Sequence, residues 1–158
     1  MIGKMKLLAG LVSGLMGGLV FGMMMAKMGA LPMIGKMIGL PTAAAGWFVH
    51  LGISAAIGVS FSTLMGWLVT GRTSSLAFGT AYGTTWWFLG PLTLMPLFMG
   101  MGLGVNWNLT AAQNMLPSLM GHMVFGVVMG FTYDLVLRQL VQRRLTADQT
   151  HQEAEAAV

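Results

Sequence analysis

The sequence has no cysteine and very little charge. Eight of its 158 residues are Lys or Arg and four are Asp or Glu, about a third of the charged share usual in a soluble globular domain. So few charges cannot cover the surface of a soluble domain. The missing cysteine excludes disulfides, thiolate metal sites and iron–sulfur clusters. Intrinsic disorder is excluded too, because 56% of the residues are hydrophobic.

The few charges are separated by long apolar stretches. No charge occurs in the 20 positions between Lys6 and Lys27, in the 35 between Lys36 and Arg72, or in the 61 between Arg72 and Asp134. A membrane-spanning helix needs about 20 mostly apolar residues. We therefore predict an all-α, polytopic membrane four-helix bundle in residues 1–145, with helices at 7–28, 44–69, 75–99 and 115–140. The polar residues 146–158 are expected to form a disordered tail.

The basic residues predict the orientation in the membrane. Four spans place both termini on one side, and only Lys27 and Lys36 then fall on the other. The remaining basic residues share the side of the termini: Lys4, Lys6, Arg72, Arg138, Arg143 and Arg144. The positive-inside rule makes that side cytoplasmic, and we interpret the chain as an integral protein of a prokaryotic cytoplasmic membrane. Topology also explains the net charge of +4, so no nucleic-acid partner is expected.

Two offsets within the sequence suggest an internal duplication. An offset of 72 pairs Gly46 with Ser118, His50 with His122, Ser54 with Gly126 and Gly58 with Gly130. An offset of 61 pairs Gly18 with Gly79 and Gly22 with Gly83. We therefore predict a tandem duplication of a two-helix hairpin, with a pseudo-two-fold axis along the membrane normal. Equivalent residues would then lie at equal depth.

Small residues recur at every fourth position, as in the series Gly10, Gly14, Gly18 and Gly22. Such rows let helix backbones approach closely in lipid. The glycine-rich faces predict tight packing within the chain and contact with other membrane subunits or with a second copy. One functional hypothesis is therefore a structural or accessory subunit of a larger membrane complex that holds no cofactor.

His50 and His122 are the two histidines of the membrane part, and an ionisable residue inside a membrane indicates function. Two imidazoles at one depth with small neighbours suit a flat macrocycle, because haem iron takes two axial ligands. The leading hypothesis is a bis-histidine haem b protein or subunit that transfers electrons. Its metal ligands would be His50 and His122, in a pocket shaped by Gly46, Ser54, Gly58, Ser118, Gly126 and Gly130. The alternative is that each histidine bonds a carbonyl or hydroxyl of a neighbouring helix.

Methionine is unusually frequent, with 17 residues, and 12 of these belong to the half of the membrane that holds the histidines. Thioether and imidazole ligands together favour Cu(I). A copper-handling membrane protein is therefore a further hypothesis, although methionine is also an adaptable packing residue.

Catalytic arrangements are missing from the sequence. No nucleophile–base pair, paired carboxylates or phosphate-binding loop appears, and we do not expect an enzyme. Asp134 precedes Arg138 by one helical turn, which is the favourable order for an ion pair. We expect that pair to end the last span at the cytoplasmic interface.

Overall fold

The computed structural model describes residues 2–156, and every regular element within that range is helical. Three helices are long and apolar enough to cross a membrane: α1 (Ile2–Lys27), α3 (Ala43–Leu64) and α7 (Leu116–Ala156). A fourth long helix is α4 (Arg72–Leu89). The short elements are α2 (Leu31–Gly35), the 3-10 helix η1 (Lys36–Ile38), the π-helix η2 (Gly90–Leu94), α5 (Met95–Phe98) and α6 (Leu109–Asn114). The predicted all-helical class is thus confirmed, and three of its helices have the length and composition that a membrane span needs.

The third predicted helix, residues 75–99, is divided in the structure. The chain is α-helical to Leu89, passes through the π-turn η2 and ends as the short helix α5. Pro91 explains the break, because proline lacks the N–H that an α-helix needs and its ring opposes the preceding turn. Serine and threonine are frequent in α4, and this helix is not among the candidate spans.

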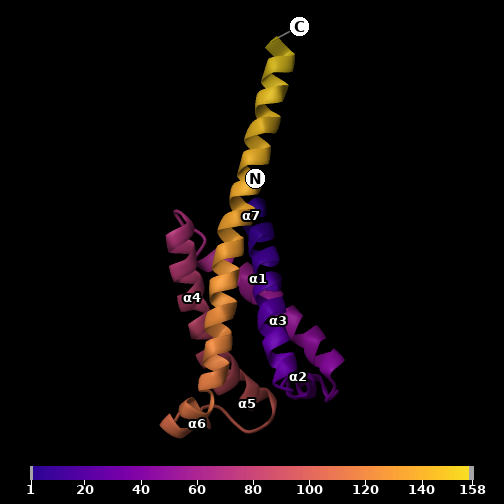
Figure 1. The fold of residues 1–158 in the computed structure, drawn as a ribbon, viewed down its shortest axis with the longest axis vertical. Coiled ribbons are helices and arrows are strands. Elements are labelled where there is room, and N and C mark those ends of the chain that lie inside the picture. The colour runs from indigo at the N-terminus through magenta and orange to yellow at the C-terminus, as the bar shows by residue number, and fades with distance from the viewer. Residues whose placement is uncertain (1, 157–158) are drawn as a thin grey trace.

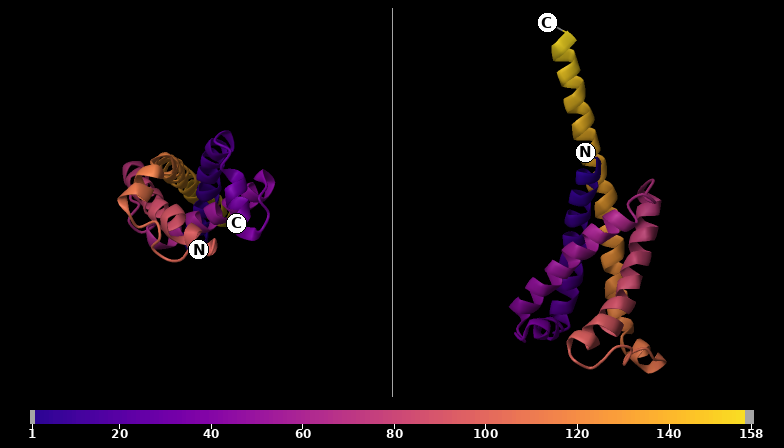
Figure 2. Two further views of the ribbon diagram at one scale, coloured as in Figure 1. Left: turned by 90° about the horizontal axis from the view of Figure 1, so that it is seen from below. Right: turned by 180° about the vertical axis from the view of Figure 1, so that it is seen from behind.

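The four long helices follow the order α3, α1, α7, α4 (Figure 1). Helix α1 packs along α7, while α3 packs on α1 and α4 packs on α7. We call the end that carries the start of α1 and of α4 the basic end, and the end that carries α2, α5 and α6 the loop end. Toward the basic end α3 crosses over to α4, and toward the loop end the two diverge (Figure 2). The four long helices therefore converge toward the basic end and separate toward the loop end.

Aromatic residues close the basic half of the molecule. The rings of Phe61 (α3) and Tyr133 (α7) are fully buried, with centroids 5.3 Å apart. Tyr82 (α4) lies 5.6 Å from Phe61, and its hydroxyl donates to Ser60 Oγ at 2.9 Å. This cluster joins α3, α4 and α7 in an aromatic core that lies closer to the basic end than the two histidines do.

Glycine contacts hold each pair of helices together. A Cβ added to Gly58 would lie 2.6 Å from the Gly14 Cα, and one added to Gly83 would lie 2.9 Å from the Gly126 Cα. The contacts recur in the two hairpins at the predicted offsets. Gly14–Gly58, Gly18–Ser54 and Gly22–His50 between α1 and α3 correspond to Ser75–Gly130, Gly79–Gly126 and Gly83–His122 between α4 and α7. Backbone proximity at these positions is what a small-residue row produces.

Asp134 connects α4 to α7 at the basic end. Its carboxylate accepts from Arg138 Nε at 2.8 Å, as predicted, and also faces Arg72 Nε of α4 at 3.5 Å. Asp134 is only 4% exposed, whereas the side chains of Arg72 and Arg138 are 55% and 60% exposed. The buried carboxylate therefore depends on two arginines that remain in contact with the surroundings.

The difference in exposure between the buried carboxylate and the two arginines leads to a testable prediction about the ion pairs. Replacing both arginines by glutamine leaves Asp134 buried without a cation and should destabilise the fold by about 3 kcal/mol. Asp134→Asn should cost about 1 kcal/mol, because the freed arginines stay hydrated. Thermal unfolding of the detergent-solubilised variants measures the difference. A larger loss for Asp134→Asn than for the double variant would contradict this account.

The residues after 145 continue α7 as a helix to Ala156, where the sequence suggested a disordered tail. This part of α7 projects beyond the rest of the chain (Figures 1 and 2). Two side-chain contacts support this helix, and each joins residues one helical turn apart. They are Arg144–Asp148 at 3.6 Å and His151–Glu155 at 3.3 Å. The last two residues of the predicted tail, 157–158, lie outside the described residues.

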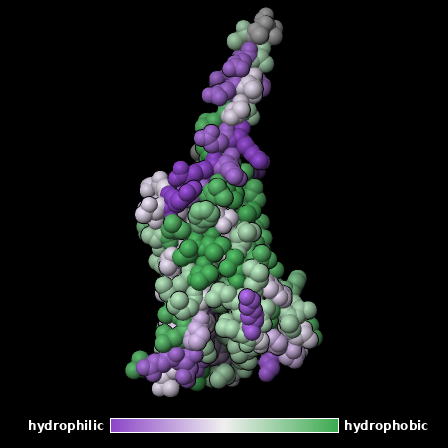
Figure 3. Space-filling view, viewed as in Figure 1, coloured by the Kyte–Doolittle hydropathy of each residue, from purple (hydrophilic) through white to green (hydrophobic). Residues whose placement is uncertain are grey.

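The surface follows the pattern of a membrane protein. A hydrophobic belt covers the body, and hydrophilic residues gather at the basic end, along the projecting part of α7 and in smaller groups at the loop end (Figure 3). Large apolar side chains such as Phe48, Val127 and Phe131 are exposed in that body. Water disfavours such a surface, whereas lipid accepts it.

Candidate functional site

A cavity of about 500 Å³ lies between the two hairpins, in the half toward the loop end. The end of α1 and helices α2 and α3 form one wall, and the other wall comes from α4, η2, α5 and the start of α7. Its lining is mostly apolar, and both His50 and His122 belong to it. The structure therefore brings the predicted histidine pair to one cavity, but the two rings are held differently.

His50 is held by the neighbouring helix. Its Nε2 lies 2.9 Å from the carbonyl oxygen of Gly18 on α1; since a carbonyl only accepts, Nε2 donates. The ring is 8% exposed and packs edge-on against Trp47 and Phe21. A Cβ on Gly22 would approach the ring to 3.1 Å. His50 thus joins α3 to α1 through a hydrogen bond. This is the arrangement of the alternative hypothesis, in which each histidine bonds a carbonyl or hydroxyl of a neighbouring helix.

His122 is held by its own helix. Its Nδ1 lies 2.8 Å from the Ser118 carbonyl oxygen and donates to it. Among the described residues Nε2 has no hydrogen-bond partner, and it faces Gly90, where an added Cβ would lie 3.8 Å away. In a neutral ring with Nδ1–H, Nε2 carries the lone pair. A metal-ligating histidine commonly donates its other N–H to a backbone carbonyl in this way.

Phe21 of α1 contacts both imidazoles. Its ring centroid lies 5.5 Å from that of His50 and 4.8 Å from that of His122. Gly121 makes room for it, since a Cβ there would lie 2.6 Å from Phe21 Cδ2. The two histidines therefore share an aromatic neighbour instead of facing each other across free space. The one sequence signal for Phe21 is that the offset of 61 pairs it with another buried aromatic residue, Tyr82.

The other predicted pocket residues divide into two groups. Ser54 and Ser118 line the cavity. The four glycines pack helices instead: Gly46 contacts the backbone of Leu31, Gly58 contacts α1, and Gly126 and Gly130 contact α4. These four glycines are not among the residues that line the cavity, because neighbouring helices cover their backbone, and their part in a cofactor pocket stays a prediction.

Methionines form much of the cavity lining. Six of them take part: Met25, Met28, Met33, Met37, Met95 and Met115. Over residues 2–156 there is no group of three or more His, Cys, Asp or Glu side chains that could hold a metal ion. A metal in this cavity would therefore be bound by imidazole and thioether groups.

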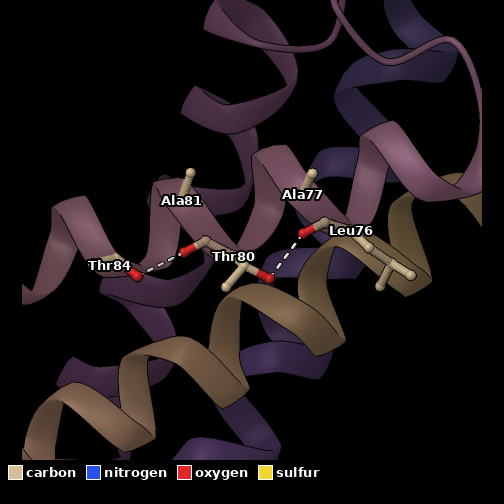
Figure 4. A pocket seen from close by; sticks show the side chains of 5 residues that line it. All are labelled: Leu76, Ala77, Thr80, Ala81 and Thr84. Carbon is tan, nitrogen blue, oxygen red and sulfur yellow. Dashed lines mark hydrogen bonds between the residues drawn. The ribbon is translucent and has the colours of Figure 1, made fainter.

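A second, open groove runs along α4 (Figure 4). It is lined by Leu76, Ala77, Thr80, Ala81 and Thr84. The Thr80 hydroxyl donates to Leu76 O at 2.8 Å, and that of Thr84 donates to Thr80 O at 2.9 Å. Both threonine hydroxyls are thus bonded within their own helix, so the histidine cavity is the stronger candidate site.

The fold and the cavity define a helical protein with three helices long and apolar enough to cross a membrane and with an apolar, histidine-lined site. No family model matches the chain, and no curated protein or solved structure matches it. The function is therefore argued from the site.

Proposed function

We propose that this chain is a four-span integral membrane protein that binds haem b in the histidine cavity and transfers electrons, as a small cytochrome or as a subunit of a membrane redox complex. The equivalent glycine contacts of the two hairpins support an origin by tandem duplication. The fourth span would be formed by α4, η2 and α5 together, residues 72–98.

The observation that carries this proposal is the free Nε2 of His122 at the wall of the cavity. Imidazole is the usual axial ligand of b-type haem, and Ser118 O holds the ring with its lone pair available. The volume falls within the roughly 300–1,000 Å³ of cofactor and ligand sites. Trp86, Phe98 and Phe125 supply apolar surface for a macrocycle.

The absorption spectrum of the full-length protein purified from its native membrane tests this proposal. We expect a Soret band that shifts on reduction with dithionite, together with pyridine haemochrome bands of b-type haem. A colourless protein that also fails to take up added haem would refute haem binding.

The six methionines of the cavity favour a second candidate, the handling of Cu(I). Thioether and imidazole ligands select Cu(I) over harder metal ions, and methionine side chains adapt to irregular spaces. Elemental analysis separates the two candidates, because Cu(I) adds no visible absorbance. A protein that holds neither haem nor copper would instead fit the third hypothesis, a structural subunit that packs through glycine faces.

The proposed topology places both termini in the cytoplasm. The start of α1, the start of α4 and the end of α7 lie toward the same end of the molecule (Figure 1), which supports an even number of spans. A reporter phosphatase fused to the C terminus should be inactive, and one inserted near residue 104 should be active. An active C-terminal fusion would mean that α4 does not cross the membrane.

A further inference from the structure

We infer that the seam between α4 and α7 binds an anionic phospholipid, with the lipid phosphate on Arg72 and Arg138 and an acyl chain in the open groove along α4. The lipid site rests on the proposed four-span topology, because α4 must lie at the lipid boundary, but it does not use the histidine cavity. A failure of lipid binding would therefore leave the haem and Cu(I) tests unaffected.

The charged groups at the basic end of this seam carry one positive charge in excess. Asp134 of α7 accepts from Arg138 Nε at 2.8 Å and faces Arg72 Nε at 3.5 Å, so two cations share one carboxylate. Each arginine uses Nε for this contact, and among residues 2–156 the terminal nitrogens of both have no hydrogen-bond partner. Both side chains are more than half exposed. Such guanidinium groups bind phosphate well, because the contact is charge-assisted and can be bidentate.

Two contacts place these guanidinium groups at the start of α4. A Cβ added to Gly71 would lie 3.8 Å from Arg138 Nη2. The Cζ atom of Arg72 lies 5.3 Å from the ring centroid of Phe131 on α7, within the range of a cation–π contact. Phe131 is itself exposed. The free donors therefore lie beside exposed apolar surface, which is where a lipid headgroup meets its acyl chains.

The groove continues from Arg72 along α4. Leu76 follows Arg72 by one helical turn and Thr80 follows Leu76 by another, and residues four apart share a helix face. Leu76 and Thr80 both line the groove (Figure 4). Helix α7 lies next to them, since a Cβ added to Gly130 would lie 3.2 Å from Leu76 Cα and one added to Gly126 would lie 2.9 Å from Thr80 Cα. The groove therefore leads from the arginine at the basic end toward the loop end.

The lining of the groove suits an acyl chain. Ala77 and Ala81 are small and exposed, so they leave space beside Leu76. The hydroxyls of Thr80 and Thr84 donate to carbonyls of their own helix, and a hydrocarbon chain leaves these bonds intact. A phosphate-binding end that continues into apolar surface matches a phospholipid, because that molecule carries both chemistries.

Native mass spectrometry of the full-length protein in a neutral maltoside detergent tests this site. The probe is dioleoyl phosphatidylglycerol, and dioleoyl phosphatidylcholine is the comparison, with the same chains and phosphate but an added cation. One arginine near an anionic headgroup changes binding about 5-fold, so the first phosphatidylglycerol should bind about 5-fold more tightly than the first phosphatidylcholine. Equal affinity for the two lipids would contradict the charge contact.

Arg72→Gln should abolish this preference, because it removes the excess charge while Asp134 keeps Arg138. Arg72→Lys keeps the charge and should retain the preference. Arg143→Gln is the matched control, since Arg143 is an exposed arginine beyond Arg138 on α7, and it should bind both lipids like the wild type. An equal loss in Arg72→Gln and Arg143→Gln would show that overall charge, and not this site, attracts the lipid.

Ala77→Leu/Ala81→Leu fills the groove and should weaken the binding of both lipids by a similar factor, because their chains are the same. Both positions are exposed, so the unfolding temperature without lipid should stay near that of the wild type. Gly52→Leu is the control, since it adds an apolar side chain to the exposed surface of α3 outside the groove. Wild-type affinity for both lipids in the filled variant would overturn the lipid site, because no acyl chain would then occupy the groove.

Discussion

Gly58→Leu is expected to leave little folded protein. A Cβ at this position already collides with the backbone of Gly14 and Gly10 on α1, and backbone atoms cannot turn aside as a flexible side chain can. A leucine would force α1 and α3 apart along the contact that builds the first hairpin. We expect a loss of about 3 kcal/mol or more, seen as aggregation in size-exclusion chromatography and a lower unfolding temperature in detergent.

Gly52→Leu is the matched control on the same helix. Gly52 is exposed, and no neighbouring atom lies within 4 Å of an added Cβ. The new side chain would enter open space at the exposed surface of α3, so the unfolding temperature should stay close to that of the wild type. If both variants unfolded alike, close backbone packing would not be the reason for the glycine at 58.

His122→Ala is expected to abolish cofactor binding completely. The substitution removes the nitrogen that we propose binds the metal, Nε2 of His122, whose ring is held by the bond from Nδ1 to the Ser118 carbonyl. The Soret band, or bound copper in the second candidate, should fall to background. The fold should persist, because the Nδ1 bond of His122 lies within its own helix.

His50→Ala should give the opposite result. It removes a buried ring and its bond between helices, so the unfolding free energy should fall by about 2 kcal/mol or more. The cofactor should remain bound. If His50→Ala removed the absorbance as fully as His122→Ala, the metal would be held by both histidines, as the sequence alone suggested.

Several elements could be predicted because they depend on local properties of the chain. Charge-free apolar stretches predicted α1, α3 and α7, since the length and composition of a segment decide whether it can cross lipid. The helix predicted at residues 75–99 is divided after Leu89 by a π-turn that contains Pro91, and this division emerges only in the structure. Asp134 and Arg138 were predicted to pair, but Arg72 joins them only through the contact of α4 with α7.

The site was predictable only in part. The spacing of residues along a helix predicts which face of the helix a side chain occupies and how deep it lies. This spacing selected His50 and His122 as candidate site residues. The spacing does not predict which ring nitrogen donates to which carbonyl oxygen, because this hydrogen bond depends on how closely another helix approaches. The offset of 72 makes the two histidines equivalent, yet His50 bonds α1 and His122 bonds its own helix.

The sequence by itself determined the class of protein: helices, apolar surface, basic residues toward one end, and two histidines in rows of small residues. These properties follow from composition and periodicity, which each segment carries alone. Only the tertiary structure decided that Phe21 contacts both imidazoles, that the predicted pocket glycines pack helices, and that six methionines line one cavity. The reason is physical: such contacts arise between segments distant in sequence, where backbone approach and side-chain volume select the neighbours.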